Sequence, residues 1–586
     1  MAVAILELMN GSPIFFNYEG VTYHGVLGGI TAIPFMKILG VGPLAYALPA
    51  TLYYSLYVWS TYLLAKVIVP RMAFLVLILM IVPAPAVLSI TLNNWPHIET
   101  AFLGNIIFLL FIYIKTNDRK SVSGVFFLFL FMGFSIYNYT YSVLHIFSVL
   151  ILYILCHEQW KKIRPSLSFS GFINSFNNLA TKSQVLVRAI DVVIVCFFIG
   201  VIFSYVFGGF GLDIAGYSIL QINELHKPVF QLAALIVARL IIRRDDVVFV
   251  LQSFDKIKQS ANPNFWRFAK FGIFGFLIGL SPRIIPIVTG DIKRGGTGFD
   301  MDFSPIKLIE HFWTLIVETL PQILGVRQPI YNWFEVGFFQ SIHLVTGVFA
   351  LIIFGVILWS TWIFLASIKA ELIRIIKLYP INFHPKLILL IFAALLFISL
   401  VLTQHGPAGT RYLLPMVGFF VIWVAIALEK LKRVTIVGFY FLIVVWIGFY
   451  ASTTLNIYKP FIRGMEIIRL PPHPLISVID FLKLKDTRVV YTNYGYSSIL
   501  TFLSKGSVVG TEYSSNARGK IQRSRSSKEE QFAVLLDKGP ALSIFQQYLL
   551  DRKIEYQTEH IENFHVLWDF KGESDSVNGL RSLIVA

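Results

Sequence analysis

Three glutamates, Glu7, Glu19 and Glu99, stand in polar segments beside apolar runs, where a carboxylate could do acid/base chemistry or bind a metal. A carboxylate within hydrogen-bond reach of a hydroxyl can accept its proton while a new bond forms. Each glutamate also has a plain structural interpretation. Glu7 could be a solvated residue, and Glu19, in NYEGVTYHG, could be a turn residue. Glu99 follows His97 by two positions, and the helix dipole favours a carboxylate in a first helical turn.

Five basic residues between the apolar runs could bind a phosphate group. They are Arg283 in LSPRIIP, Lys293 and Arg294 in one long loop, Arg327 in GVRQ and Arg411 in GTRY. A guanidinium presents parallel N–H groups that match two phosphate oxygens. The same side chains could instead reach towards lipid headgroups.

The acid spacing in GTGFDMDF gives one candidate metal site, Asp300 and Asp302. In an extended backbone, two such carboxylates can reach one divalent cation, Mg²⁺ or Mn²⁺. This spacing also arises by chance in polar loops. The two cysteines, Cys156 and Cys196, lie in or beside apolar runs, so the sequence predicts neither a disulfide framework nor a cysteine metal site.

The elements that must position these residues are strongly apolar. The 586-residue chain has a mean hydropathy of +0.70 and only 14% charged residues, whereas soluble domains carry about 25%. Runs of about 20 apolar residues, the length that crosses a bilayer, occupy most of the chain. The net charge of +16 is scattered over short loops without a continuous basic stripe, which argues against nucleic acid as a partner. We therefore expect an integral membrane protein.

Apolar runs bounded by charge predict an α-helical polytopic bundle of about twelve spans. The predicted spans are residues 42–65, 71–91, 99–114, 121–137, 140–156, 189–208, 229–242, 266–282, 341–366, 387–403, 411–429 and 434–451. Segment 229–242 is short, and Arg239 interrupts it.

Basic residues predict the orientation, because Lys and Arg collect in cytoplasmic connections. One set of alternate connections holds 24 Lys and Arg, and the opposite set holds eight. This asymmetry places residues 1–41, 283–340 and everything after 452 on the outer face of the plasma (inner) membrane. Met1 would then lie outside, although residues 1–20 contain no segment that could carry an N-terminus across. We expect either an earlier start with a thirteenth span or translocation by the following helix.

The tail, residues 458–586, predicts a small α/β domain that follows the membrane domain, residues 1–457. Its apolar runs shorten to five or six residues. Strand-like pieces (RVVYTNY, SVVGTEY and FHVLWDF) alternate with helical ones (LISVIDFLK and ALSIFQQYLLDRK). The stretch SSNARGKIQRSRSSKEE predicts a solvated loop or, as an alternative, a surface for an anionic partner.

Four stretches carry a family resemblance. They are LELMNGSPIFFNYEGVTYHGVLGGITAIPFMKILG, NNWPHIETAFLG with Glu99, LPQILGVRQ with Arg327, and GTRYLLPMVGFFVIW with Arg411. With the α/β tail, they resemble the GT-C superfamily of integral membrane glycosyltransferases. The chain is most similar to the group that includes protein O-mannosyltransferases and lipid A aminoarabinose transferases.

The resemblance implies an inverting transfer of a hexosyl or pentosyl group from a polyprenyl-phosphate donor on the outer face. A carboxylate, Glu7, Glu19 or Glu99, would take the proton of the acceptor hydroxyl. Cationic groups, Arg411, Arg327 or Arg283, or a metal would stabilise the departing phosphate. The acceptor could be a lipid, a polysaccharide or a protein. No Gly-rich phosphate loop precedes a predicted helix, which argues against a nucleotide sugar at a cytoplasmic site.

One departure from the family concerns the acid of its first outer loop. That residue usually lies several positions before the segment that begins here, so the matching position falls upstream of Met1. A start downstream of the true one would remove this acid and the first span together. A genuinely short or inactive form is the alternative.

Two other classes of function stay open. A transporter or flippase for a lipid-linked glycan would place ionisable groups inside its spans. The predicted spans contain almost none; His145 and His343 are the main exceptions, and no internal repeat is visible. A non-catalytic GT-C-like membrane subunit is the second alternative.

Overall fold

The computed structural model describes only part of the chain. The described residues are 2–11, 25–92, 96–117, 121–156, 193–194, 210–214, 217–222, 231–232, 263–288, 299–302, 304–325, 344–376, 379, 381–403, 407–458, 462–463, 466–467, 473–512, 531–537 and 539–572. The chain divides into two compact units. The terminal unit comprises Met1–Pro49, Gly290–Gly295 and Tyr458–Ala586, and the helical unit comprises Ala50–Thr289 and Gly296–Ile457.

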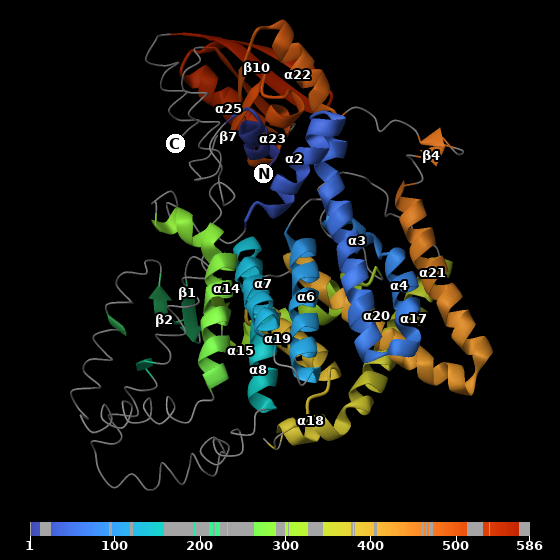
Figure 1. The fold of residues 1–586 in the computed structure, drawn as a ribbon. Helices are drawn as coiled ribbons and strands as arrows, with labels where there is room; N and C mark the ends of the chain where they lie inside the picture. Colours follow the sequence, from blue (N-terminus) through green and yellow to red (C-terminus); the bar gives the residue numbers. More distant parts are fainter. Residues whose placement is uncertain are drawn as a thin grey trace. The chain divides into compact units, whose positions relative to one another are not determined.

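The described part of the helical unit consists mainly of apolar helices (Figure 1). Its elements are α3 (Pro43–Ile68, which begins in the terminal unit), η1 (Pro70–Met72), α4 (Ala73–Ile81), α5 (Pro85–Leu92), α6 (His97–Thr116), α7 (Val122–Asn138), η2 (Thr140–Ser142), α8 (Val143–Leu155), β1 (Phe210–Ile214), β2 (Tyr217–Ile222), α14 (Pro263–Val288), β3 (Phe299–Asp302), α15 (Pro305–Thr314), the π-turn η3 (Leu315–Thr319), α16 (Leu320–Ile323), α17 (Leu344–Ser367), α18 (Lys369–Ile376), α19 (Lys386–Leu402), η4 (Pro407–Leu413), α20 (Leu414–Val434) and α21 (Ile436–Tyr458). Strands β2, β1 and β3 form a small sheet in that order.

Five helices of the described part are long and apolar enough to cross a membrane. They are His97–Thr116, Trp266–Ile285, Val348–Ser367, Gly409–Val434 and Ile436–Thr454. Each of the five overlaps a predicted span. Three further predicted spans are the shorter apolar helices Val122–Asn138, Thr140–Leu155 and Lys386–Leu402. The predicted spans 189–208 and 229–242 fall almost wholly outside the described residues, so the count of twelve stays a prediction.

The predicted span 71–91 differs from the structure, because it is broken. Helices α4 and α5 are bent by 73° where they meet. Pro83 and Pro85 explain the break, since proline lacks an N–H group and disfavours helix in the residue before it. The hydroxyl of Tyr54 donates to the carbonyl oxygen of Met80 at 2.6 Å, so a carbonyl freed near the break has a partner.

Helices α7 and α14 run side by side with their backbones in direct contact (Figure 1). Glycines permit this approach. A Cβ atom at Gly279 would lie 2.1 Å from the carbonyl oxygen of Leu130, and one at Gly133 would lie 2.2 Å from that of Phe276. Small residues at such positions let helices in a membrane approach each other closely.

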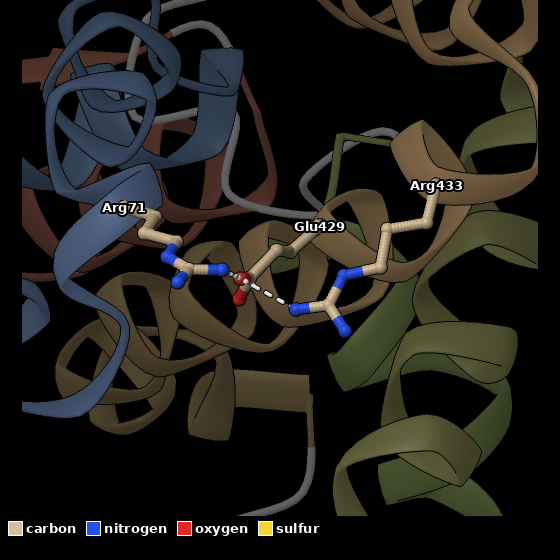
Figure 2. A network of polar contacts seen from close by, with 3 residues as sticks. All are labelled: Arg71, Glu429 and Arg433. Atoms are coloured by element: carbon tan, nitrogen blue, oxygen red, sulfur yellow. Dashed lines mark hydrogen bonds and ion pairs between the residues drawn. The ribbon is translucent and has the colours of Figure 1, made fainter.

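The end of the helical unit at which α3, α6 and α20 finish is basic. There Glu429 pairs with Arg433 at 3.2 Å and with Arg71 at 3.9 Å (Figure 2). Lys386 also lies at this end, where its Nζ donates to Ser367 at 3.3 Å. Residues of the connections predicted to be cytoplasmic therefore come together at one end. Helix α6 spans 20 residues, about 30 Å at 1.5 Å per residue, so its first residue lies at the opposite end.

The terminal unit contains the predicted α/β domain. Its elements are α1 (Ala2–Met9), α2 (Leu27–Leu39), β4 (Ile462–Arg463), β5 (Glu466–Ile467), α22 (Leu475–Leu484), β6 (Val489–Thr492), α23 (Tyr494–Leu503), β7 (Val509–Glu512), β8 (Phe532–Asp537), α25 (Pro540–Asp551), β9 (Glu555–Ile561) and β10 (Phe564–Lys571). Five strands form one sheet in the order β7-β6-β8-β10-β9. Strand β6 is parallel to β7 and β8, and β10 is antiparallel to β8 and β9.

Successive side chains of the strands point to opposite faces of the sheet, and helices cover both faces, which gives three layers. Val490 of β6 packs in a cluster with α22 and α23, whereas Val489 and Tyr491 pack in a cluster with α25. The period of two along β6 thus explains why helices cover both faces. The predicted strands and helices of the tail are confirmed as β6, β7, β10, α22 and α25, while α23, β8 and β9 were not predicted.

We expect Gly279→Ala to destabilise the protein by about 1–3 kcal/mol or more, because the new methyl group would overlap the backbone of α7. Gly355→Ala in α17 is the matched control, since nothing lies within 4 Å of its Cβ position. The control should be neutral or slightly stabilising, because alanine favours helix. Thermal unfolding of the purified protein in detergent measures both. Equal melting temperatures would contradict the proposed backbone contact.

The pH dependence of the α/β domain should reflect His473. Its Nδ1 accepts a hydrogen bond from the N–H of Leu475 at 3.2 Å, and burial lowers the pKa of the imidazole below its ordinary value of 6.5. A lowered pKa in the folded state contributes stability above pH 6.5 that is lost as the pH falls through the folded value. His473→Asn keeps a side-chain acceptor without the titration. The difference in melting temperature between unmodified protein and variant should therefore change below pH 6.5, and a constant difference from pH 5 to 8 would refute this role.

Candidate functional site

Polar side chains gather at the end of the helical unit where α6 begins. Helix α6 contributes His97 and Glu99, the end of α7 contributes Asn138, α14 contributes Arg283, and η4 contributes Arg411. Glu99, Asn138 and Arg283 are almost fully buried. Ionisable groups beside apolar spans are costly, and they usually mark a functional site.

Four aromatic rings join the segments at this end, and we call them the aromatic cluster: His97, Tyr139, Tyr141 and Tyr412. The His97 ring meets Tyr139 and Tyr412 edge-on, with centroid distances of 5.0 and 5.3 Å. The rings of Tyr139 and Tyr412 are parallel within 11°. The hydroxyl of Tyr141 lies 3.2 Å from that of Ser399 in α19. The cluster thus fixes the start of α6 against η2, η4 and α19.

Arg411 is held beside this cluster by its neighbour in the chain. Its Nη2 donates to the hydroxyl of Tyr412 at 3.3 Å, and its Cζ lies 5.1 Å from the centre of that ring. The adjacent Thr410 donates to Oε1 of Gln322 in α16 at 2.7 Å. The motifs GTRY and LPQILG therefore meet in space. The π-turn η3 leads directly into α16, and such turns recur at functional sites.

Arg283 has only 3% of its surface exposed. Its Nη1 donates to the carbonyl oxygen of Ile136 at 3.3 Å, near the end of α7. A guanidinium near a helix C-terminus is favoured by the helix dipole. Arg283 therefore joins α14 to α7 and at the same time places a positive charge near Asn138 and Tyr139.

Glu99 has 1% of its surface exposed, and its Oε2 has no hydrogen-bond partner within the part of the chain that the structure describes. It lies two residues after His97 on α6, which turns its side chain about 200° around the helix from the imidazole. The two side chains therefore lie on different sides of α6. Both side-chain atoms of Asn138 and Nε2 of Gln322 also lack partners among the described residues. Buried polar atoms in this state call for an explanation, which a substrate would supply.

The remaining predicted site residues fall elsewhere. Glu7 lies on α1 of the terminal unit and has 2% of its surface exposed. Glu19 and Arg327, like Lys293 and Arg294, lie outside the described residues. Asp300 and Asp302 lie in β3, so the extended backbone that the metal prediction requires is present, and Asp302 pairs in register with Asp213 of β1. No group of three or more metal-binding side chains occurs among the residues searched, which are the described ones.

His145, one of the two histidines in the predicted spans, is a packed residue. Its ring lies 4.3 Å from Phe392 and 5.3 Å from Phe108, measured between centroids. A Cβ atom at Gly104 would overlap the ring, so this glycine makes room for it. His343 lies outside the described residues.

Sequence reasoning missed the residues between α7 and α8. The run YNYTYS supplies Asn138, Tyr139 and Tyr141, and it interrupts two apolar runs. Such a polar and aromatic run between spans is a signal that could have indicated the site. Gln322 and Thr410 gave no comparable signal, because their contact joins positions 88 residues apart.

No family model and no curated protein matches the chain. Among solved structures it is similar to ArnT from Cupriavidus metallidurans bound to undecaprenyl phosphate, with a TM-score of 0.48, 11% identity and coverage of 98% of this chain and 93% of that one. The apo state of ArnT from the same organism has a TM-score of 0.45 and 10% identity, with coverage of 97% of this chain and 92% of that one. A third similar structure is the archaeal oligosaccharyltransferase AglB from Archaeoglobus fulgidus in complex with an inhibitory peptide and a dolichol-phosphate. Its TM-score is 0.43 and its identity 10%, with coverage of 98% of this chain and 70% of that one.

ArnT and AglB are membrane glycosyltransferases of the GT-C superfamily, the group that the sequence resembles. All three TM-scores are below 0.5 and all three identities are 10–11%, so no function follows from these similarities.

Thr410→Val should destabilise the protein by about 1–3 kcal/mol, because it leaves the buried Oε1 of Gln322 without this donor. Thr361→Val in α17 is the matched control. Its hydroxyl bonds only to the carbonyl of Ile357 in the same helix, so its loss should cost less than about 0.5 kcal/mol. Equal unfolding midpoints for the two variants would show that the contact between η4 and α16 contributes nothing.

Proposed function

We propose that the protein is a membrane glycosyltransferase of GT-C type that moves a sugar from a polyprenyl-phosphate donor to an acceptor hydroxyl. One observation carries the proposal. An almost fully buried carboxylate, Glu99, shares one end of an apolar bundle with two guanidinium groups, those of Arg283 and Arg411. The polyprenyl-phosphate class of donor follows from the sequence resemblance.

The reaction needs opposite charges at two points. The acceptor oxygen forms a bond to the anomeric carbon of the sugar while the bond from that carbon to the phosphate oxygen breaks. The acceptor proton passes to a carboxylate, and we assign this role to Glu99. The departing polyprenyl phosphate keeps the bonding electrons, and Arg411 with Arg283 stabilises its charge. Attack from the side opposite the phosphate inverts the configuration.

Several parts of the proposal rest on the sequence alone. Glu7 and Glu19 stay alternative bases, and Arg327 stays a third phosphate ligand. A divalent cation at Asp300 and Asp302 stays a prediction. The site would face the outside of the plasma membrane, because the basic end of the helical unit is the one predicted to be cytoplasmic. The acceptor would be a lipid, a polysaccharide or a protein.

Transfer of radiolabelled sugar from a polyprenyl phosphate into a membrane extract tests the proposal. Glu99→Gln should lower the rate by about 10²-fold or more, because it keeps the shape of the side chain and removes the proton acceptor. Arg411→Ala should also lower it, since a cation at the leaving phosphate is lost. Glu371→Gln in α18, at the basic end, is the matched control and should keep the full rate.

The outcomes separate the possible errors. Full transfer by the Glu99→Gln variant would show that Glu99 is not the base and would leave Glu7 or Glu19 in that role. Absence of transfer by the unmodified protein from any polyprenyl-phosphate sugar would refute the donor. Movement of a lipid-linked glycan between leaflets without transfer would favour a flippase instead.

A further inference from the structure

Helix α23 of the α/β domain has two apolar faces. Tyr496, Ile499 and Leu500 pack in the cluster that covers one face of the sheet. Phe502 belongs to a second cluster, where only 7% of its surface is exposed. A helix that covers one sheet needs a single apolar stripe, so the second face requires a second partner.

That partner is the beginning of the chain. The second cluster contains Val3 and Ile5 of α1, Ala32 and Met36 of α2, and Ala45 at the start of α3. The ring of Tyr46 also lies against Phe502, with a centroid distance of 5.6 Å. The ring of Phe502 therefore contacts Tyr46 and lies in one apolar cluster with three segments of residues 1–49.

Helix α1 cannot hold its place without this contact. It has eight residues, whereas isolated helices shorter than about 12 residues are marginal in water. Its side chains from Val3 to Glu7 are all buried. The position of α1 therefore depends on what it packs against, which includes α23 and α2.

Helix α23 is itself fixed rigidly on the sheet. A Cβ atom at Gly510 in β7 would lie 2.3 Å from the carbonyl oxygen of Ser497, so strand and helix are in backbone contact. The N–H of Gly510 donates to the hydroxyl of Thr501 at 2.9 Å. The hydroxyl of Ser504 bonds both the N–H and the carbonyl of Val508 at 3.0 Å. Helix α23 therefore offers a fixed surface to the residues that pack on its second face.

We propose that the C-terminal α/β domain is a positioning module for the first outer segment of the enzyme, and that Phe502 is its central positioning residue. This inference rests on the proposed function in the form that takes Glu7, the alternative to Glu99, as the base. Glu7 lies on α1, and Glu19 lies between α1 and α2 in the sequence. Phe502 acts through these helices and touches no substrate. The domain thus holds the helix that carries Glu7, one of the three candidate acids.

Hydrogen exchange of the full-length protein, followed by mass spectrometry, tests the docking directly. Phe502→Ala should raise exchange of the amides of α1 and α2 by about tenfold or more, because local opening becomes easier. Exchange in β6 and β8 should stay unchanged. Phe502→Leu keeps part of the apolar contact and should give an intermediate rise. Phe545→Ala is the matched control, since Phe545 packs in the cluster on the opposite face of the sheet.

Sugar transfer by the same variants tests the positioning role. Phe502→Ala should lower kcat about tenfold and leave the KM for the polyprenyl-phosphate donor within about twofold, because the proposed phosphate ligands lie on other elements. Phe545→Ala should change neither parameter.

Unchanged exchange in α1 and α2 would overturn the proposal whatever the activity shows. Raised exchange with unchanged kcat would show that the domain docks these helices without a role in the reaction, which also overturns it. If the unmodified protein transfers no sugar, the proposed function fails and the positioning role fails with it, while the exchange result still decides whether the domain holds the two helices.

Discussion

The helical unit depends on one constraint: polar atoms among apolar helices must find hydrogen-bond partners. Several of them do so across helix interfaces. Asn105 of α6 donates to the hydroxyls of Ser60 and Thr61 in α3, and the hydroxyl of Tyr57 bonds the first turns of α20. Such bonds join helices that the hydrophobic effect alone would leave free to slide. The carboxylate of Glu99 and the amide of Asn138, at the start of α6 and the end of α7, keep unpartnered atoms within the described chain. Together with the buried Arg283 at the same end, these atoms mark the candidate site, although Oγ of Ser360 and Nε1 of Trp423 elsewhere in the unit also lack partners within the described chain.

Many of the helices could be predicted from the sequence, because the backbone polar groups of a helix in a bilayer must be bonded within their own segment. Apolar runs therefore predicted α6 to within two residues at each end, whereas α20 and α21 extend five and seven residues beyond their predicted ends. The break in segment 71–91 was not predicted, since the composition of the segment is uniformly apolar and only Pro83 and Pro85 mark the bend. In the tail, short strand-like apolar runs predicted β6 and β10, whereas β8, which is buried along most of its length as β6 is, was not singled out.

The candidate site was only partly predictable, for a physical reason. Glu99, Arg283 and Arg411 could be named from their types and their places beside apolar runs. Their surroundings could not be named, because contacts such as Thr410 with Gln322, or Phe502 with Val3, join positions far apart and follow from packing that no local pattern encodes. The fate of Arg283 illustrates this limit. Its type suggested a phosphate ligand, yet the structure also gives it a bond to α7 that the sequence did not indicate.

The candidate bases Glu99 and Glu7 are held in place in different ways. A proton acceptor must stay within fractions of an ångström of the reacting hydroxyl, which requires a rigid support. Glu99 has that support within the helical unit, because it lies on a 20-residue helix whose first residue is enclosed by Tyr139 and Tyr412. Glu7 lies on an eight-residue helix that is ordered by docking in the terminal unit. If Glu99 is the base, proton transfer proceeds without the C-terminal domain. If Glu7 is the base, the same domain becomes part of the catalytic scaffold, and Phe502 helps to position the carboxylate.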